Sequence, residues 1–267
     1  MRLSPITLAP QNDAGQTETI HMCDAPHEIG TGWRGWMDLP APATLDPTGP
    51  WIDLSHPLSS DMPRISFFPV PRFEQIMEMP EHPLNVTEVQ MVVHLGTHVD
   101  SPRHFFRDGP AFEDIPIERL HGAGVVWRVE KEPNSLIEPE DLEACTPKLQ
   151  PGDILLLSAG WSGFAGSSKY DDEHPSLSVA AAEWIVAQKV KLLAIDFPTP
   201  DLPVAQRPEG FDWPVHHALL GDGVLVSEHL RNVEALVGGR AEFVFCALNI
   251  TKADGAPARV LARPIAG

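Results

Sequence analysis

The chain has 267 residues, of which 43% are hydrophobic and 21% are charged, and this length suits one large domain or two small ones. Its 37 acidic side chains outnumber its 19 basic ones, and the net charge of −18 disfavours binding to the phosphates of nucleic acids. No run of about 18 apolar residues predicts a membrane helix, and the N-terminus lacks the order of a signal peptide, so we expect a cytoplasmic protein.

Residues 1–50 are predicted to form an irregular N-terminal extension. They contain seven prolines and little sustained periodicity. Trp33 and Trp36 are too large and apolar for a solvated tail. We therefore expect this segment to drape over the body of the protein or to pack on a neighbouring subunit.

Residues 51–267 are predicted to form one mixed α/β domain. Short apolar runs between turn signals predict strands at residues 89–93, 124–130, 153–159, 191–196, 223–227, 242–248 and 259–262. The unbroken apolar runs within 154–157 and 192–195 indicate strands that are buried on both faces. Helices are expected at 139–144, 178–189 and 214–220, with Ser176 or Ser178 as the cap of the second. Strands outnumber helices, which favours a mixed α/β domain over a TIM barrel.

The cysteines do not indicate a disulfide framework or a thiolate zinc site. There are three of them, Cys23, Cys145 and Cys246, and none forms a CxxC pair. We expect isolated thiols in or near a core.

The most informative segment is His94-Leu95-Gly96-Thr97-His98-Val99-Asp100-Ser101-Pro102-Arg103-His104. Its three imidazoles and one carboxylate all fall at even positions, so in an extended chain they would share one face. Imidazole nitrogen and carboxylate oxygen are ligands that Zn²⁺ prefers and Mn²⁺ accepts. A single histidine is usually structural, but four such groups in alternating register indicate a metal site.

A second, weaker cluster contains His216, His217 and Glu228. The spacing predicts a short helix, a glycine turn and a strand that carries one acidic residue. By itself this pattern is equally typical of solvated polar side chains.

These residues resemble the metal-dependent cyclase family, which includes bacterial kynurenine formamidase and isatin hydrolase. The segment from 94 to 104 fills the family pattern His-x-Gly-Thr-His-x-Asp-x-Pro-x-His without departure. The similarity also includes 53–58 (Asp-Leu-Ser-His-Pro-Leu), 159–161 (Ala-Gly-Trp), 193–198 (Leu-Ala-Ile-Asp-Phe-Pro) and the pair His216 and Glu228. It covers roughly residues 51–267, whereas residues 1–50 have no counterpart in the family.

The resemblance implies a metal site for one or two divalent ions, zinc or manganese, per subunit. His94, His98 and Asp100 would bind the first ion. In formamidase-like members Asp100 would bridge to a second ion held by His216 and Glu228, and in isatin-hydrolase-like members one ion is expected. The family also implies a swivelling β/β/α fold and a homodimer or higher homo-oligomer with active sites near the subunit interface.

The expected activity is metal-dependent hydrolysis of a C–N bond in a small cyclic or aryl amide. The ion would lower the pKa of its bound water so that hydroxide attacks the carbonyl, and His104 would act as acid and base. Four aromatic side chains are candidates for stacking on the substrate: Phe67, Phe68, Trp161 and Phe197. Two alternatives remain open at this point. One is a lactone hydrolase or polyketide-type cyclase/dehydratase, and the other is a binding protein that keeps the metal without catalysis.

Overall fold

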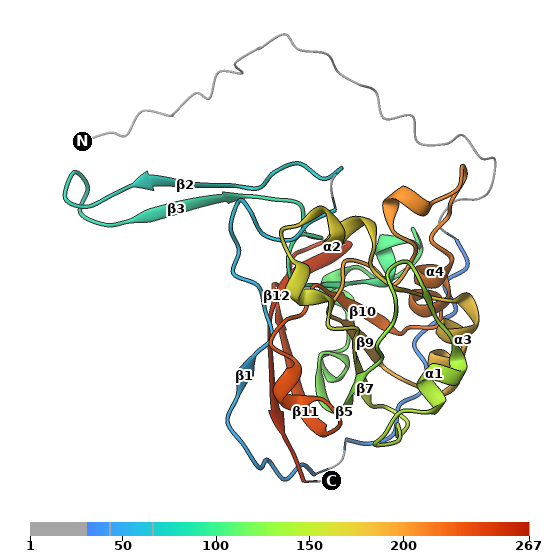
Figure 1. Ribbon diagram of the computed structural model, residues 1–267. Coiled ribbons are helices and arrows are strands. Elements are labelled where there is room, and N and C mark those ends of the chain that lie inside the picture. The colour runs from blue at the N-terminus through green and yellow to red at the C-terminus, as the bar shows by residue number, and fades with distance from the viewer. Residues whose placement is uncertain (1–30, 43, 66, 267) are drawn as a thin grey trace.

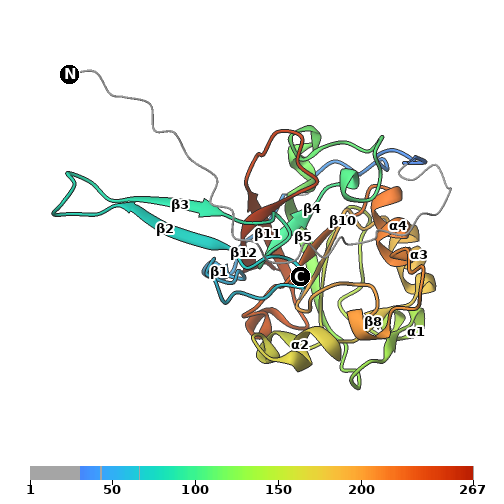
Figure 2. The same cartoon turned by 90° about the horizontal axis from the view of Figure 1, so that it is seen from above.

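A closed sheet of seven strands forms the body of the protein in the computed structural model, which describes residues 31–42, 44–65 and 67–266. Around the barrel the order is β4, β12, β11, β5, β7, β9 and β10, and β10 pairs again with β4. Helices α1, α3 and α4 lie on one side of the barrel, and a long hairpin projects from the opposite side (Figures 1 and 2). The barrel strands are β4 (His98–Asp100), β5 (His121–Arg128), β7 (Ile154–Ser158), β9 (Leu192–Ile195), β10 (Leu225–Glu228), β11 (Arg240–Ala247) and β12 (Gly255–Pro264).

The barrel is mixed in strand direction. Strands β5, β7, β9 and β10 run parallel to one another, whereas β4, β11 and β12 pair antiparallel with their neighbours. Strand β1 (Ile52–Asp53) pairs with β12 beyond the part of that strand that pairs with β4. The expected mixed α/β domain is confirmed, while the swivelling β/β/α description remains a prediction.

The central parallel strands are buried on both faces, as the unbroken apolar runs predict. On β7, Leu155 and Leu157 belong to a core cluster that includes the helices. The alternating residues Ile154 and Leu156 belong to a second cluster formed mainly by strands across the barrel. Alternation of side chains along a strand therefore supplies both cores from one apolar run.

The helices begin where capping signals occur in the sequence. They are α1 (Pro139–Glu143), α2 (Ser168–Asp172), α3 (Val179–Ala187) and α4 (Pro214–Gly221). The Ser178 side chain accepts a hydrogen bond from the Ala181 backbone N–H at 3.1 Å and caps α3, which confirms one of the two predicted caps. Proline occupies the first position of α1 and α4, where its missing N–H costs nothing. Within the described residues, each helix is too short or too polar to cross a lipid bilayer.

The structure corrects the prediction of one extended segment through the histidine motif. Only the three residues of β4 form a strand. Gly96 before it adopts φ +61°, a turn conformation that glycine reaches without strain, and residues 102–104 after it form a 3₁₀ turn that begins with Pro102. The predicted strand at 89–93 is also shifted, because β3 covers Val86–Gln90.

The projecting hairpin consists of β2 (Arg72–Met77) and β3, and sequence analysis missed β2. Five of the six β2 residues are exposed, so the strand lacks the alternation of polar and apolar residues that marks a half-buried strand. A second small sheet pairs β6 (Leu136–Ile137) with β8 (Ser176–Leu177) beside the helices.

Residues 31–42 and 44–50 run along the body without a helix or strand of their own. Trp33 packs against the helix-side core, and the Trp36 ring lies 4.4 Å from the guanidinium carbon of Arg119. Arg119 also donates a 2.6 Å hydrogen bond to the Met37 carbonyl. Cys23 and the prolines before position 31 lie outside the described residues.

Candidate metal centre

Strand β4 brings the metal-competent side chains together because it lies between β10 and β12 (Figure 2). His98 and Asp100 are two residues apart on β4, so their side chains share one face. Glu228, the last residue of β10, pairs directly with His98 across the antiparallel ladder. His216 reaches the same place from the first turn of α4.

Four buried side chains converge at this point. The Nε2 atom of His98 lies 3.3 Å from Oδ1 of Asp100 and 3.5 Å from Oε2 of Glu228. The Nε2 atom of His216 lies 3.5 Å from Oδ2 of Asp100 and 3.3 Å from Oε1 of Glu228. Each carboxylate therefore turns one oxygen toward each imidazole.

The tautomers of both histidines are set by hydrogen bonds on the far side of each ring. Nδ1 of His98 donates to the Gly96 carbonyl at 2.8 Å, and Nδ1 of His216 donates to Oδ2 of Asp201 at 2.6 Å. When the ring is neutral, each Nε2 therefore presents a lone pair to the centre. Among the described residues, neither Nε2 has a hydrogen-bond partner, and both atoms are buried.

This arrangement fits a divalent cation. Two buried carboxylates are costly unless positive charge compensates them, and the imidazole Nε2 atoms aimed at them offer further ligands. Tetrahedral coordination with bonds of about 2.0–2.1 Å gives ligand–ligand separations of roughly 3.3 Å, close to the distances at this centre. Among the described residues, Asp100, His216 and Glu228 form one group whose ligand atoms lie within 4.8 Å of one another, and His98 and Glu228 form another with His229.

His94 and His104 lie beside this centre and share a carboxylate. Their rings stack with centroids 3.9 Å apart. Oδ2 of Asp254 lies 2.9 Å from Nε2 of His94 and 3.5 Å from Nδ1 of His104. Nδ1 of His94 lies 2.7 Å from Oδ1 of Asp100, so Asp100 joins His94 to the four converging side chains.

The neighbouring charges separate the pKa values of the two stacked histidines. Burial alone would lower the pKa of His94, but Asp100 and Asp254 raise it to about 10. Burial and, second, the adjacent charge of His94 together lower the pKa of His104 to about 4. The hydrogen bonds that Asp254 accepts, first from His104 and second from His94 in order of size, hold its pKa far below its usual range. His104 is thus a neutral base beside the centre.

Gly255 allows the close packing of His94 at this edge of the barrel. It pairs with Asp100 across the β4–β12 ladder. A Cβ atom at position 255 would lie 2.6 Å from Cε1 of His94, closer than real contacts allow. The position therefore requires glycine.

The four predicted stacking residues occupy different surroundings. The Phe68 ring stacks toward His94 at a centroid distance of 6.5 Å, and Phe67 beside it is 52% exposed. Trp161 and Phe197 are buried in the helix-side core. Phe105, which follows the histidine motif, stacks on His216 at 4.8 Å and forms another wall of the site.

Sequence analysis missed two carboxylates. Asp201 accepts hydrogen bonds from the Val215 and His216 backbone N–H groups at 3.0 and 3.1 Å, in addition to the imidazole of His216. Asp201 lies in the loop after β9. The only signal for it in the sequence is that it follows the apolar run of a buried strand. Asp254 lies in the turn before β12, about 150 residues from the histidines it contacts, and no local pattern connects them.

Known proteins are similar to this chain in sequence and in fold. The Cyclase family model matches residues 52–202, more than half of the chain. A kynurenine formamidase of Bacillus mycoides (strain KBAB4) is 29% identical over 228 residues, which cover 82% of this chain and 99% of that protein. Isatin hydrolase A from Ralstonia solanacearum has the same fold, with a TM-score of 0.71 and 24% identity over 80% of this chain and 91% of its own. A protein described as a potential metal-dependent hydrolase with cyclase activity has a TM-score of 0.65 and 26% identity, covering 80% of this chain and 96% of its own.

The matched residues 52–202 include the complete histidine motif. His216 and Glu228 follow this range in the sequence, and the fold places both side chains at the same centre. The chain belongs to the Cyclase family.

Proposed function

We propose that the protein is a metal-dependent hydrolase that cleaves the C–N bond of a small aryl or cyclic amide. The observation that carries the proposal is the convergence of His98, Asp100, His216 and Glu228, with two unpaired Nε2 atoms facing two buried carboxylates. The kinship with a kynurenine formamidase supports the same reaction class. None of the relatives named above is described as a lactone hydrolase, and the cyclase alternative is supported by the description of one of them, whereas the kynurenine formamidase matches 82% of this chain and 99% of its own length.

The donor set suits Zn²⁺ or Mn²⁺. We propose that Asp100 serves two ion positions, because its Oδ1 faces His94 and His98 while its Oδ2 faces His216. Binding of an ion by His94 requires loss of a proton from its imidazolium form, so metal uptake would release protons. When bound, the ion supplies a Lewis acid that polarises a carbonyl and lowers the pKa of water from about 15.7 to about 7.

The protein's own residues supply the proton transfer. Neutral His104 takes a proton from the attacking water and delivers it to the departing nitrogen, because an amine leaves poorly as an anion. Asp254 orients the His104 ring through its Nδ1 side. Phe68 and Phe105 line the approach to the centre and offer flat surfaces to an aryl or cyclic substrate.

The test compares wild type with His104→Ala on N-formylkynurenine, isatin, an imide and a lactone. We expect hydrolysis of at least one C–N substrate, and a fall in its kcat by about 10²–10⁴-fold in the variant with metal content unchanged. His121→Ala, which removes an exposed imidazole on β5, is the matched control and should keep full activity. Unchanged activity in His104→Ala would exclude its assigned role, and hydrolysis of the lactone alone would exclude the C–N substrate class.

A further inference from the structure

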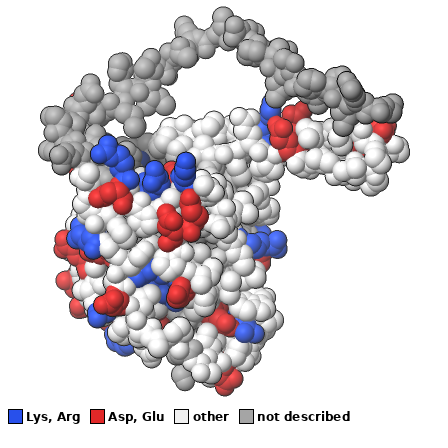
Figure 3. All heavy atoms as spheres, turned by 180° about the vertical axis from the view of Figure 1, so that it is seen from behind, with Lys and Arg blue, Asp and Glu red and all other residues white. Residues whose placement is uncertain are grey.

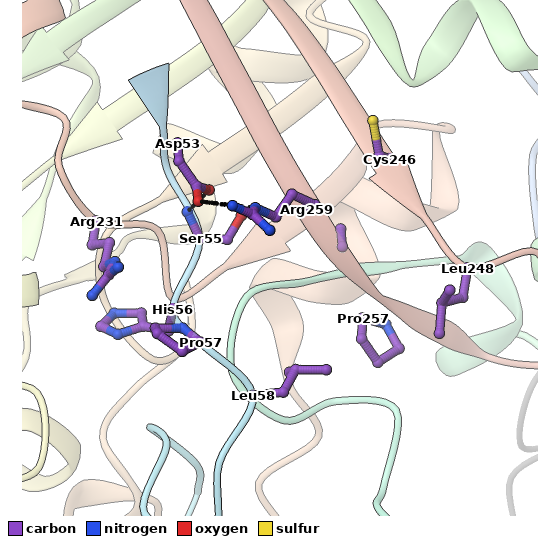
Figure 4. A pocket seen from close by; sticks show the side chains of 11 residues that line it. Asp53, Ser55, His56, Pro57, Leu58, Arg231, Cys246, Leu248, Pro257 and Arg259 are labelled. Atoms are coloured by element: carbon purple, nitrogen blue, oxygen red, sulfur yellow. Dashed lines mark hydrogen bonds and ion pairs between the residues drawn. The ribbon is translucent and has the colours of Figure 1, made fainter. Parts of the chain in front are cut away.

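A groove beside β12 is separate from the metal centre. It has a volume of about 500 Å³ and lies against β1, β12 and the end of β11 (Figure 4). Its lining, within the described part of the chain, includes none of the side chains of the metal centre. A volume of this size is typical of sites for small organic ligands. The groove is therefore a candidate for a second binding site.

One end of the groove is aliphatic. Leu58 and Leu248 line it and are 43% and 57% exposed, and Pro257 lies between them. In Figure 4 these three side chains lie apart from Arg231 and His56, which stand together at the other end of the groove. Exposed aliphatic side chains in a concave site favour a ligand with an apolar body.

The polar end of the groove contains one guanidinium without a counter-charge. Arg259 is paired with Asp53 at 2.8 Å, so these two charges compensate each other. Nε of Arg231 is buried, and among the described residues it has no hydrogen-bond partner. Nε2 of the neighbouring His56 is buried and unpartnered in the same sense. Buried polar groups normally have partners, so this end of the groove lacks an acceptor.

These two groups match a single carboxylate. Burial and, second, the charge of Arg231 lower the pKa of His56 to about 4, so the imidazole is neutral at pH 7 and offers one N–H. The guanidinium alone then supplies positive charge, and one positive charge balances a monoanion. The net charge of −18 further disfavours anions of higher charge. A carboxylate has one oxygen for Arg231 and one for His56.

Both polar groups are held in place by the fold. The backbone N–H of His56 donates to Oγ1 of Thr97 at 2.9 Å, and that of Arg231 donates to the Leu54 carbonyl at 3.0 Å. A site whose groups are already positioned loses less entropy when a ligand binds.

We propose that the groove is a second ligand site, which binds a monocarboxylate with a compact aliphatic body. The carboxylate contacts Arg231 and His56, and the aliphatic body packs on Leu58 and Leu248. This site goes beyond the proposed hydrolase function and does not depend on it.

The test uses Cys246 as a reporter of occupancy, because its thiol is exposed and lines the groove. In a Cys23→Ser/Cys145→Ser background it is the one remaining cysteine. Its rate of alkylation by iodoacetamide is measured by mass spectrometry with and without ligand. Cyclohexanecarboxylate at about 10 mM should slow alkylation by about 10-fold if its Kd is about 1 mM. Cyclohexylmethanol, which has the same ring without the charge, should have little effect, and so should inorganic phosphate.

Substitutions in the groove identify the contacts. Arg231→Gln should raise the Kd of cyclohexanecarboxylate by about 10- to 100-fold, because it removes a charged hydrogen-bond donor. Leu248→Asp should weaken binding by at least about 10-fold more than the neutral Leu248→Asn, because it places a like charge beside the ligand. The control is Arg72→Gln, which removes the same charge from the β2–β3 hairpin, a separate lobe in Figure 3, and should leave the Kd unchanged.

Absence of protection by cyclohexanecarboxylate would overturn the proposal. Equal protection by cyclohexylmethanol or phosphate would contradict the assigned ligand class, and protection that persists in Arg231→Gln would contradict the assigned contact. Alkylation of Cys246 reports on the groove alone, so a carboxylate that also binds at the metal centre does not affect the result. None of these readouts depends on bound metal or on amide hydrolysis, so they stand apart from the test of the proposed function.

Discussion

At the scale of single residues, the centre depends on groups that hold the ligands as much as on the ligands. Asp201 accepts three hydrogen bonds from the start of α4, one of them from the His216 ring, and thereby fixes the tautomer that leaves Nε2 toward Asp100 and Glu228. A carboxylate that accepts a hydrogen bond from the ring nitrogen facing away from the metal raises the basicity of the ligating imidazole. The sequence motif reveals His216 but not the residue that orients it.

Replacing Asp201 with Asn is therefore expected to weaken metal binding by about 10- to 100-fold while the protein stays folded. The measurement is a competitive titration against a chromogenic chelator. Asp212→Asn, an exposed neighbour in the same loop, is the control and should bind metal as wild type does. Equal affinity in the two variants would refute the role of Asp201.

A second single-residue effect concerns pH. His174 is fully buried, and burial lowers its pKa from 6.5 to about 4. In the unfolded chain His174 takes up a proton near pH 6.5, whereas in the folded protein it stays neutral down to about pH 4. The contribution of His174 to the free energy of unfolding is therefore complete above pH 6.5 and is lost as the pH falls toward 4.

Between pH 7 and pH 5 the free energy of unfolding should therefore drop by about 2 kcal/mol on account of His174. Urea denaturation of wild type and His174→Gln at both pH values isolates this contribution, because the other buried histidines are common to both proteins. A variant with the same pH dependence as wild type would show that His174 does not titrate in this way.

At the scale of elements, local signals predict the central strands and the helices α1, α3 and α4 well, whereas α2 was not predicted. The unbroken runs of β7 and β9 and the proline and serine signals of α1, α3 and α4 all mark real elements within a few residues. The extended reading of the histidine motif fails because Gly96 and Pro102 impose turns on either side of β4. Strand β2 escapes detection because its exposed side chains carry no burial pattern.

The packing of parallel strands makes a sharp prediction at Gly124, where β5 pairs with β7. A Cβ atom there would lie 2.0 Å from the carbonyl oxygen of Ile154, a rigid backbone atom. Gly124→Ala should lower the free energy of unfolding by at least about 2 kcal/mol, as overpacking typically does. Gly163→Ala is the control, since its Cβ would meet nothing within 4 Å, and chemical denaturation should show it near wild type. Equal midpoints for both variants would contradict the strand packing.

At the scale of the whole molecule, the site is a product of barrel closure. Glu228 on β10 contacts His98, and Asp254 before β12, 156 residues after His98, contacts His94; both contacts arise because β4 pairs with both neighbouring strands. Local sequence patterns contain no information on such pairings, so the resemblance to a family was needed to join His216 and Glu228 to the motif. The same long-range pairing leaves the hairpin outside the barrel.

The metal content of the purified protein tests the central claim most directly. Elemental analysis of wild type and His98→Ala, prepared side by side, should find at least one equivalent of a divalent transition metal per chain in wild type and a large loss in the variant. Wild type without bound metal that still hydrolyses its amide substrate would contradict the account, as would undiminished metal in His98→Ala.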